Sequence, residues 1–523
     1  RVVKILQLQT MAEGPEDRDI ELMLEFYALR HELRGIERSL KHPFVVDLVW
    51  GQMLELKQRR HQCALDLLRL MREQRLKRLI DNQQNRTSLR NLSKLLRRRD
   101  RKLKSDLKRE IDQRLLTDAF PGWASTNRAL CEVLPASPGL FDVVVIDEAS
   151  QCDLALAGVA LMRGKRAVVV GDPNQLRHVC FLSRTREQAY CVKNNLDDAE
   201  QRRFHFRRSL FDVAADVVQQ QHFYLLDEHF RSHPHIINFS NARFYDGDLK
   251  IMTGRPGNVQ SALELRQVGG GRESDSSVNL AEVEDTIQQM VRFVELQHQR
   301  RPLSIGVVSP FRDHADEIQR RVMETFSSDV ILRHEMTVGT AHALQGDEKD
   351  VVIMTTSIDK DAHRGSLQFL ESPNLFNVAV TRARERLVIV TSVEPADLPK
   401  GLLKDFLVYA NNPGQNFHEG DRQRSAFERR LSAQLKKDGI EVWLDFDATG
   451  TRVPLVAGAD ESRIAVMCDA HNTTSAEPWI QLEQQLRLSR AGWNITRIPH
   501  RSFVENPQAV SEYVTALLSD SDK

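Results

Sequence analysis

The 523-residue sequence has few cysteines and no long apolar run. Its six cysteines are scattered without a C-x-x-C pair, which argues against a disulfide framework and against a cysteine-based zinc site. The longest apolar stretches have four to six residues, as in Val143 to Ile146. Runs of this length suit buried strands and are too short to cross a bilayer. We therefore expect a protein without a membrane segment, in the reducing cytoplasm.

The sequence also has no net charge, because 73 basic residues balance 73 acidic ones, but the charge is unevenly placed. Between Lys57 and Arg114 there are 20 Lys/Arg and 7 Asp/Glu, an excess of 13 positive charges. Such a segment is a candidate for binding a polyanion, since neutralising phosphates releases counterions. Its candidate contacts are Arg97, Arg98 and Arg99. The alternative interpretation is a solvated helical face.

The residue composition and the apolar pattern of the chain change near residue 117. Before it, the sequence is rich in Leu and Arg, almost without Gly, and apolar residues recur at three- and four-residue steps, which predicts a helical arm. After it, short β-branched runs alternate with helical segments, as in a parallel α/β sheet. The predicted parts are a helical arm (1–116), two α/β blocks (117–218 and 219–400), a linker (401–423) and a small α/β tail (424–520).

Two predicted strands of the first block end in chemically useful residues. Asp147 and Glu148 follow the run Val143 to Ile146, at the strand end where open α/β sheets place their ligand crevice. In a nucleotide hydrolase the first acid would hold Mg²⁺ through water, and the second would orient the attacking water. Alternatively, they are solvent-facing acids after a strand.

The next strand ends in Gly171 and Asp172, with Gln175 three residues on. A carboxamide at that place can donate to a γ-phosphate oxygen and accept from the attacking water. The order DEAS, then GDPNQL, resembles motifs II and III of superfamily 1 helicases, in the branch of the nonsense-mediated-decay RNA helicase.

Further segments resemble the later motifs of that family in the expected order. LDEHFRSHPHI resembles motif IV with Arg231, and SPFRDHADEI, which begins at Ser309 and Pro310, resembles the short motif after it. VGTAHALQGDEKDVVI resembles motif V, and NVAVTRARERLVIV resembles motif VI with Arg382 at the arginine-finger position. His314 departs from the family, where many relatives have Gln.

The resemblance implies a fold and a mechanism. The fold is α/β, with two RecA-like P-loop NTPase lobes that close on ATP and Mg²⁺, the first lobe being incomplete. Glu148, Gln175, Arg231 and Arg382 would be catalytic, the arginines stabilising charge on the γ-phosphoryl group. The candidate nucleotide-binding residues are Asp147, Gly171, Asp172, Gln345, Gly346 and Glu348, and the candidate nucleic-acid contacts are Ser309, Pro310, Thr340 and His342.

One family motif is missing. No G-x-x-x-x-G-K-S/T loop occurs in the sequence, so the cradle for the β- and γ-phosphates is absent from it. We expect the phosphate loop to lie upstream of Arg1, the chain being truncated there, and the basic arm to be the family's insertion in the first lobe. The alternative is a nucleic-acid-binding module that does not hydrolyse ATP.

The tail from residue 424 resembles restriction-endonuclease-like domains of the PD-(D/E)XK type, close to very-short-patch-repair nucleases. Pro454 and Met467 stand at two of the family's metal-binding acid positions, and only Asp469 is an acid. Because Mg²⁺ needs several oxygen ligands, we expect an inactive domain, with an active metal-dependent nuclease as the alternative. The overall prediction is a helicase that moves along single-stranded or forked nucleic acid, 5′ to 3′, with DNA favoured over RNA.

Overall fold

The computed structural model describes residues 23–32, 46–96, 112–178, 180, 182–256, 262–273, 276–296, 301–344, 346–359, 367, 370–413, 425–459, 462–469 and 478–520. The chain divides into two compact units. Within the described part, the first unit contains the residues up to Gly171, His178–Asp216 and part of Thr474–Glu483. The second contains Asp172–Arg177 and the remaining residues from Val217 onward.

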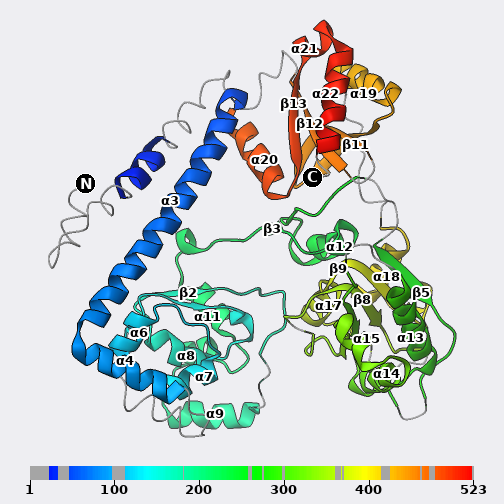
Figure 1. Ribbon diagram of the computed structural model, residues 1–523. Coiled ribbons are helices and arrows are strands. Elements are labelled where there is room, and N and C mark those ends of the chain that lie inside the picture. The colour runs from blue at the N-terminus through cyan, green and yellow to red at the C-terminus, as the bar shows by residue number, and fades with distance from the viewer. Residues whose placement is uncertain are drawn as a thin grey trace. The chain divides into compact units, whose positions relative to one another are not determined.

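The first unit begins with the predicted helical arm. Its longest helix, α3 (Val46–Asp81), is followed after Asn82 by α4 (Gln83–Leu96), which runs at an angle to α3 in Figure 1. The Asn82 side chain accepts the N–H of Gln84 at 2.9 Å, as an N-cap does, so this residue starts a new helix. Leu92 of α4 packs with Leu116 and Leu134, which fixes the end of the arm on the rest of the unit.

Beyond the arm, the first unit has a two-stranded parallel sheet. Strand β1 (Val144–Ile146) pairs with β2 (Ala167–Val169), as the apolar runs predict. The Asp153 side chain caps the helix between them, accepting the Leu156 N–H at 3.0 Å. The surrounding helices are α6 (Gln113–Ala119), α7 (Asn127–Val133), the short η1 (Ala149–Gln151), α8 (Leu154–Met162), α9 (Arg184–Lys193), α10 (Asp198–Arg203) and α11 (Leu210–Val217).

The second unit contains a five-stranded parallel sheet with the strand order β5-β9-β8-β6-β7. The strands are β5 (Leu263–Gln267), β6 (Ile305–Val308), β7 (Thr337–Gly339), β8 (Lys349–Thr355) and β9 (Ala383–Thr391). The helices around it are α12 (Pro234–Phe244), α13 (Leu280–Glu295), α14 (Arg312–Thr325), α15 (Ser328–Arg333), α17 (Pro373–Val380), η3 (Pro395–Asp397) and α18 (Leu402–Asn411). The short helix η2 (Gln220–His222) precedes them in the chain, and its residues are exposed. A small separate sheet pairs β3 (Glu228–His229) with β4 (Lys250–Ile251).

Both faces of the five-stranded sheet are buried. Val352 and Met354 of β8 belong to one apolar core, and Val351 and Ile353 belong to the other. Alternate residues of a strand point to opposite faces of the sheet. Because helices cover both faces, residues on both sides of β8 are apolar, and the strand forms a continuous apolar run in the sequence. This confirms the predicted parallel α/β arrangement of this block.

The sequence predicted a linker at 401–423, and this prediction is wrong for the first half of the segment. The structure has helix α18 at Leu402–Asn411, and its Leu403, Phe406 and Leu407 are buried in the core of the second unit. The ring of Phe406 lies 5.0 Å from that of Phe239 and 5.1 Å from that of Phe376. Although helix α18 lies between two domains in the sequence, its spaced apolar residues pack into the core, so the helix belongs to the sheet domain.

The C-terminal domain is built on a four-stranded sheet with the order β10-β11-β12-β13. Its strands are β10 (Glu441–Ala448), β11 (Thr451–Ala459), β12 (Ser462–Asp469) and β13 (Asn494–Pro499), of which only β12 and β13 are parallel. Its helices are α19 (Ala426–Lys437), α20 (Pro478–Arg490), α21 (His500–Glu505) and α22 (Pro507–Asp520). Ser425 and Glu428 form a capping box at the start of α19.

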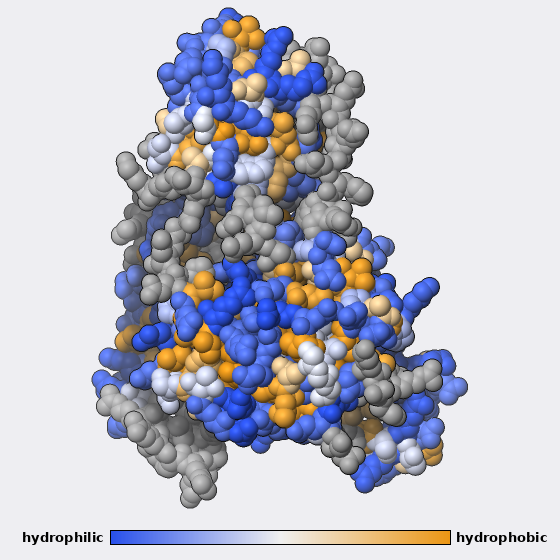
Figure 2. Space-filling model, turned by 90° about the vertical axis from the view of Figure 1, so that its right-hand side faces the viewer, coloured by the Kyte–Doolittle hydropathy of each residue, from blue (hydrophilic) through white to orange (hydrophobic). Residues whose placement is uncertain are grey.

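No helix among the described residues combines the length and the apolar character needed to span a bilayer. Figure 2 shows the side of the molecule that lies at the right of Figure 1, where hydrophilic residues separate the hydrophobic ones. Among the described residues, exposed apolar side chains include Met323 of α14 and Leu332 of α15, at 66% and 76% exposure. Single apolar residues of this kind are ordinary on protein surfaces.

Candidate nucleotide and nucleic-acid sites

The first unit presents two carboxylates at the end of β1. Asp147 and Glu148 are both exposed, and Glu148 has a left-handed backbone with φ 53°. A non-glycine residue rarely adopts this conformation outside turns and functional sites. The Gln151 side chain donates to the Glu148 carboxylate at 2.9 Å, a partner that the sequence did not indicate. The two acids are therefore accessible and oriented by a short local turn.

Gly171 supports this turn from the end of β2. The Ala149 N–H donates to the Val170 carbonyl at 2.8 Å, so the residues after β1 lie against the end of β2. A Cβ on Gly171 would come within 2.8 Å of the Phe211 ring and 2.9 Å of the Ser150 hydroxyl. Only glycine fits this close approach without displacing its neighbours.

Asp172 lies in the second unit and is the centre of a polar network. Its carboxylate accepts the Gln175 amide at 3.1 Å and the Tyr245 hydroxyl at 2.7 Å. Burial and the adjacent Asp172 carboxylate raise the pKa of Tyr245, so this hydroxyl is a donor at neutral pH. The Gln175 side chain thus has an internal partner, and its expected contact with a γ-phosphate stays a prediction.

Two carboxamides that the sequence analysis did not single out hold the same segment. The Asn377 amide donates to the Asn174 carbonyl at 3.0 Å and to the Tyr245 hydroxyl at 2.9 Å. The Asn374 amide donates to the Pro173 carbonyl at 2.8 Å. Asn377 opens the NVAVTRAR motif, so its position was a usable signal. The main chain of Pro173 and Asn174 is therefore fixed by side chains of α17.

Arg231 forms an ion pair with Glu348, which also pairs with Arg384 at 3.3 Å. The side chain of Arg231 is 33% exposed, so part of it faces solvent. Just before it, His229 accepts the Ser232 N–H at 2.9 Å, and burial together with Arg231 lowers the pKa of His229 to about 4. A neutral imidazole can accept this bond, which tightens the turn that carries Arg231. Glu348, a candidate nucleotide-binding residue in the sequence analysis, forms ion pairs with two arginines here.

Arg382 is buried, with 3% exposure. Its Nε donates to the Val378 carbonyl at 3.2 Å, and its own carbonyl accepts the Lys349 N–H at 3.1 Å. The two arginines of the TRAR motif thus differ, since the Arg384 side chain is 43% exposed. The sequence motif singles out Arg382 by its position and does not show which of the two arginines is covered.

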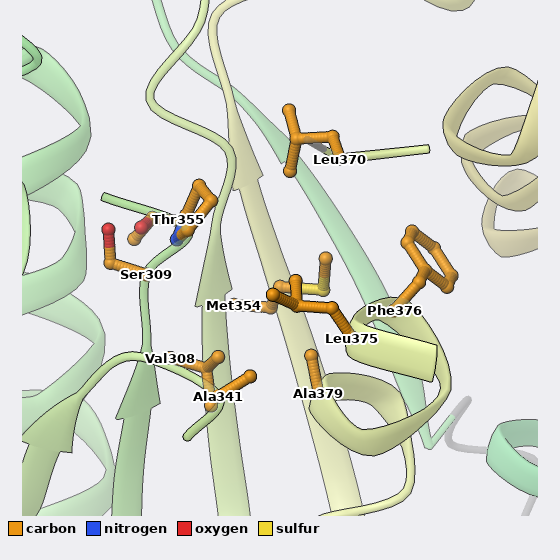
Figure 3. Close-up of a pocket in the computed structure, with 10 residues that line it drawn as sticks. Val308, Ser309, Ala341, Met354, Thr355, Leu370, Leu375, Phe376 and Ala379 are labelled. Carbon is orange, nitrogen blue, oxygen red and sulfur yellow. The ribbon is translucent and has the colours of Figure 1, made fainter. Parts of the chain in front are cut away.

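The candidate nucleic-acid contacts lie at the carboxyl ends of β6 and β7. Ser309 and Pro310 follow β6 and line a small pocket, shown in Figure 3, with the Ser309 and Thr355 hydroxyls on one wall and Phe376 of α17 on another. The Ser309 hydroxyl donates to the Phe311 carbonyl at 3.0 Å, and no partner is described for the buried Thr355 hydroxyl. The pocket walls are otherwise apolar.

The next two candidates follow β7. Thr340 is half-buried and its carbonyl accepts the Ala343 N–H at 2.9 Å, whereas His342 is exposed. Gly346 has φ 79°, a conformation that favours glycine. Five of the predicted residues lie outside what the structure describes, namely Arg97, Arg98, Arg99, Gln345 and the side chain of Asp469.

The described residues contain no group of three or more His, Cys, Asp or Glu side chains placed to hold a metal ion. In the C-terminal domain, Met467 of β12 packs against an apolar cluster that includes Trp493. Pro454 lies in the neighbouring strand β11. Asp147 and Glu148 offer the carboxylate oxygens that Mg²⁺ prefers, so they fit the expected Mg²⁺ held with a nucleotide.

Three family models match the chain. AAA_11 and AAA_12, each described as an AAA domain, match residues 30–182 and 206–394, and REase_MTES_1575 matches residues 427–518. The AAA_11 match runs from the helical arm through Asp147 and Gln175. The AAA_12 match contains Arg231, Glu348 and Arg382.

Several similar proteins are named as helicases. The "Uncharacterized ATP-dependent helicase MG140 homolog" of Mycoplasma pneumoniae is 25% identical over 62% of this chain and 30% of its own length. "Helicase SEN1" of Saccharomyces cerevisiae is 26% identical over 51% of this chain and 12% of its own length. "Helicase sen1" of Schizosaccharomyces pombe is 25% identical over 55% and 17%. The chain spans less than a third of each of these relatives.

The chain combines the AAA_11 and AAA_12 domains of superfamily 1 helicases with a small restriction-endonuclease-like domain. The family resemblance and the fold class drawn from the sequence motifs are therefore confirmed. The relative from Mycoplasma pneumoniae is named as ATP-dependent, and all three of these relatives are named as helicases.

Proposed function

We propose that this chain is the motor part of an ATP-dependent helicase or translocase that moves 5′ to 3′ along single-stranded or forked DNA. The observation that carries the proposal is the exposed pair Asp147 and Glu148 on a left-handed turn at the end of β1. A backbone strained in this way at an exposed acid is typical of a functional site. The matches to helicase domains supply the reaction class.

The side chains divide the chemistry of ATP hydrolysis among them. Mg²⁺ bound with ATP would neutralise charge on the phosphates, and Asp147 is the carboxylate that would hold it through water. Glu148 would orient the attacking water and accept its proton. Arg231 and Arg382 would stabilise charge developing on the γ-phosphoryl group, with Gln175 as a further polar contact to the attacking water.

Glu148→Gln in the complete protein tests this assignment. The amide keeps the shape of the side chain but cannot accept the proton, so we expect ATP binding to persist and turnover to fall by roughly a thousandfold or more. Strand-stimulated ATPase and nucleotide binding are measured together. The control is Glu132→Gln, a partly exposed acid of the same unit that pairs with Arg128. Normal turnover in Glu148→Gln would refute the proposal.

Alanine at Arg231 or at Arg382 tests the contribution of the arginines. Each is expected to reduce turnover by about a thousandfold. Arg320→Ala is the control, because Arg320 is an exposed arginine whose ion pairs among the described residues are with Glu317 and Glu324 of its own helix. If turnover in the Arg231 and Arg382 variants equals that of the control, these arginines have no role in hydrolysis.

The substrate class and direction need their own assay. DNA and RNA strands of equal length are compared as activators of the ATPase, and forked substrates with a 5′ or a 3′ tail are compared for unwinding. Greater stimulation by DNA and unwinding from the 5′ tail are expected. Reversing the charge of Arg97, Arg98 and Arg99 should weaken binding and flatten its salt dependence, and an unchanged salt slope would assign the arm to a solvated face.

We further propose that the C-terminal domain does not cut DNA. In the structure Met467, at one of the two acid positions lost from the nuclease pattern, packs against an apolar cluster. Incubating the protein with DNA and Mg²⁺ tests this. Cutting that disappears in Asp469→Ala would show an active nuclease instead.

A further inference from the structure

A short segment of the second unit packs against the C-terminal domain. This docking segment, residues 250–256, follows α12 and contains β4. Met252 is 2% exposed and belongs to the same apolar cluster as Trp493 and Leu488 of the C-terminal domain. The Arg255 guanidinium lies 4.4 Å from the centroid of a Trp493 ring, and it donates to the Ala491 carbonyl. A cation over an indole ring is an attractive contact, so the segment is held by both apolar and charged groups.

Two more contacts join the same parts. Arg490, at the end of α20, forms an ion pair with Glu228 of β3, with Nε 3.2 Å from the carboxylate. Arg463 of β12 donates from Nε to the Pro256 carbonyl at 3.1 Å. Because β3 pairs with β4, the docking segment and Glu228 form one small platform. The C-terminal domain thus contacts this platform at β3 and at the residues that follow β4.

The apolar cluster includes a strand position of the nuclease-like sheet where the family resemblance predicts a metal ligand. Met467, which stands where the resemblance places a metal-binding glutamate, packs against the cluster that contains Met252 and Trp493. The Phe446 ring, 5.7 Å from the Trp493 ring, packs against it as well. A position that serves metal binding in active nucleases therefore contributes here to an apolar contact within the chain.

The platform is connected to Arg231 by short hydrogen bonds. The Thr253 hydroxyl donates to the Ser232 carbonyl at 2.6 Å, and the Met252 N–H donates to the His229 carbonyl at 2.9 Å. Arg231 lies between His229 and Ser232. The turn that carries this arginine is thus fixed on one side by the docking segment and on the other by Glu348.

We propose that the nuclease-like domain works as a non-cutting brace that holds the docking segment and thereby fixes Arg231 for ATP hydrolysis. Arg255, Trp493 and Arg490 are then positioning residues, which act through Arg231 without touching the nucleotide. The kinetic part of this proposal rests on the proposed function. The docking itself does not, because it can be measured without ATP.

Hydrogen exchange of the complete protein, without nucleotide, tests the docking. In Arg255→Ala and in Arg490→Glu, the amides of residues 228–233 and 250–253 should exchange about fivefold faster, the factor that corresponds to about 1 kcal/mol. The amides of β8 should keep their rates. Arg501→Glu is the matched control, because within the part of the chain that the structure describes Arg501 pairs with Glu505 of its own helix and with no other acid. Unchanged exchange in both test variants would overturn the proposal.

Steady-state kinetics of the same variants test the positioning. We expect kcat to fall about tenfold while KM for ATP stays unchanged, since a misplaced arginine weakens the transition state rather than ATP binding. Combining Glu228→Arg with Arg490→Glu reverses the ion pair and should restore both kcat and slow exchange. Faster exchange with wild-type kcat would refute the positioning role. If the unaltered protein shows no ATPase, the proposed function fails, and the exchange result still decides the docking.

Discussion

Replacing Glu282 by Gln should destabilise the protein, because several hydrogen-bond donors point at the buried carboxylate of this residue. Glu282, in the first turn of α13, is completely buried. One of its oxygens accepts the Ser357 N–H at 2.7 Å and the Thr356 N–H at 3.1 Å, and the other accepts the Ser392 N–H at 3.1 Å. The carboxylate therefore joins α13 to the chain that leaves β8 and β9.

The magnitude follows from this count of donors. An amide has one oxygen, so its NH₂ group must face at least one backbone N–H that has lost its acceptor. A buried donor left unsatisfied costs about 1–3 kcal/mol, and the loss of charge weakens the bonds that remain, which gives a total of about 3 kcal/mol. Burial raises the pKa of Glu282 to about 7, against the opposing effect of these N–H bonds.

Thermal unfolding at pH 8 measures the effect, because above the pKa the carboxylate is mainly ionised. For a unit of this size about 1 kcal/mol changes Tm by about 2–4 °C, so Glu282→Gln should lower Tm by about 6–12 °C. Glu284→Gln is the matched control on the same helix, where an exposed carboxylate pairs with Arg321. Equal Tm values for the two variants would refute the reasoning. Since the folded-state pKa is raised, the wild type should gain stability over Glu282→Gln as the pH falls from about 7 to 4.5.

Three further variants test other parts of the structure. Burial and Arg272 lower the pKa of His314 to about 4. The wild type should therefore lose up to about 3 kcal/mol of folding stability relative to His314→Gln as the pH falls from 6.5 to 4. Parallel pH profiles of Tm for the two proteins would contradict this. Phe406→Ala should destabilise the second unit by about 3–5 kcal/mol in urea unfolding, whereas a true linker residue would change nothing. Gly171→Ala should cost about 1–3 kcal/mol because its Cβ would meet Phe211, and a wild-type unfolding midpoint would show that the contact relaxes.

The strands of the second unit were predictable because their signal is local. Ile305–Val308 is strand β6 as expected, and the apolar runs near Val351 and Leu387 fall within β8 and β9. Runs buried on both faces are apolar throughout, so the sequence shows them directly. The residues after these strands could be placed at one sheet edge for the same reason. Helix α18 was missed because the position of a segment between two domains says little about where its apolar face packs.

The sequence by itself determined the order of the motifs, the residue types at the strand ends and the loss of acids from the C-terminal domain. Tertiary structure alone decided which of these side chains are available. Arg382 and Arg384 stand two residues apart in one motif, yet one is buried and the other is half-exposed. The contact of Arg255 with Trp493 joins residues more than two hundred positions apart. Such contacts depend on how distant surfaces fit together, and a local pattern of residues carries no record of that fit.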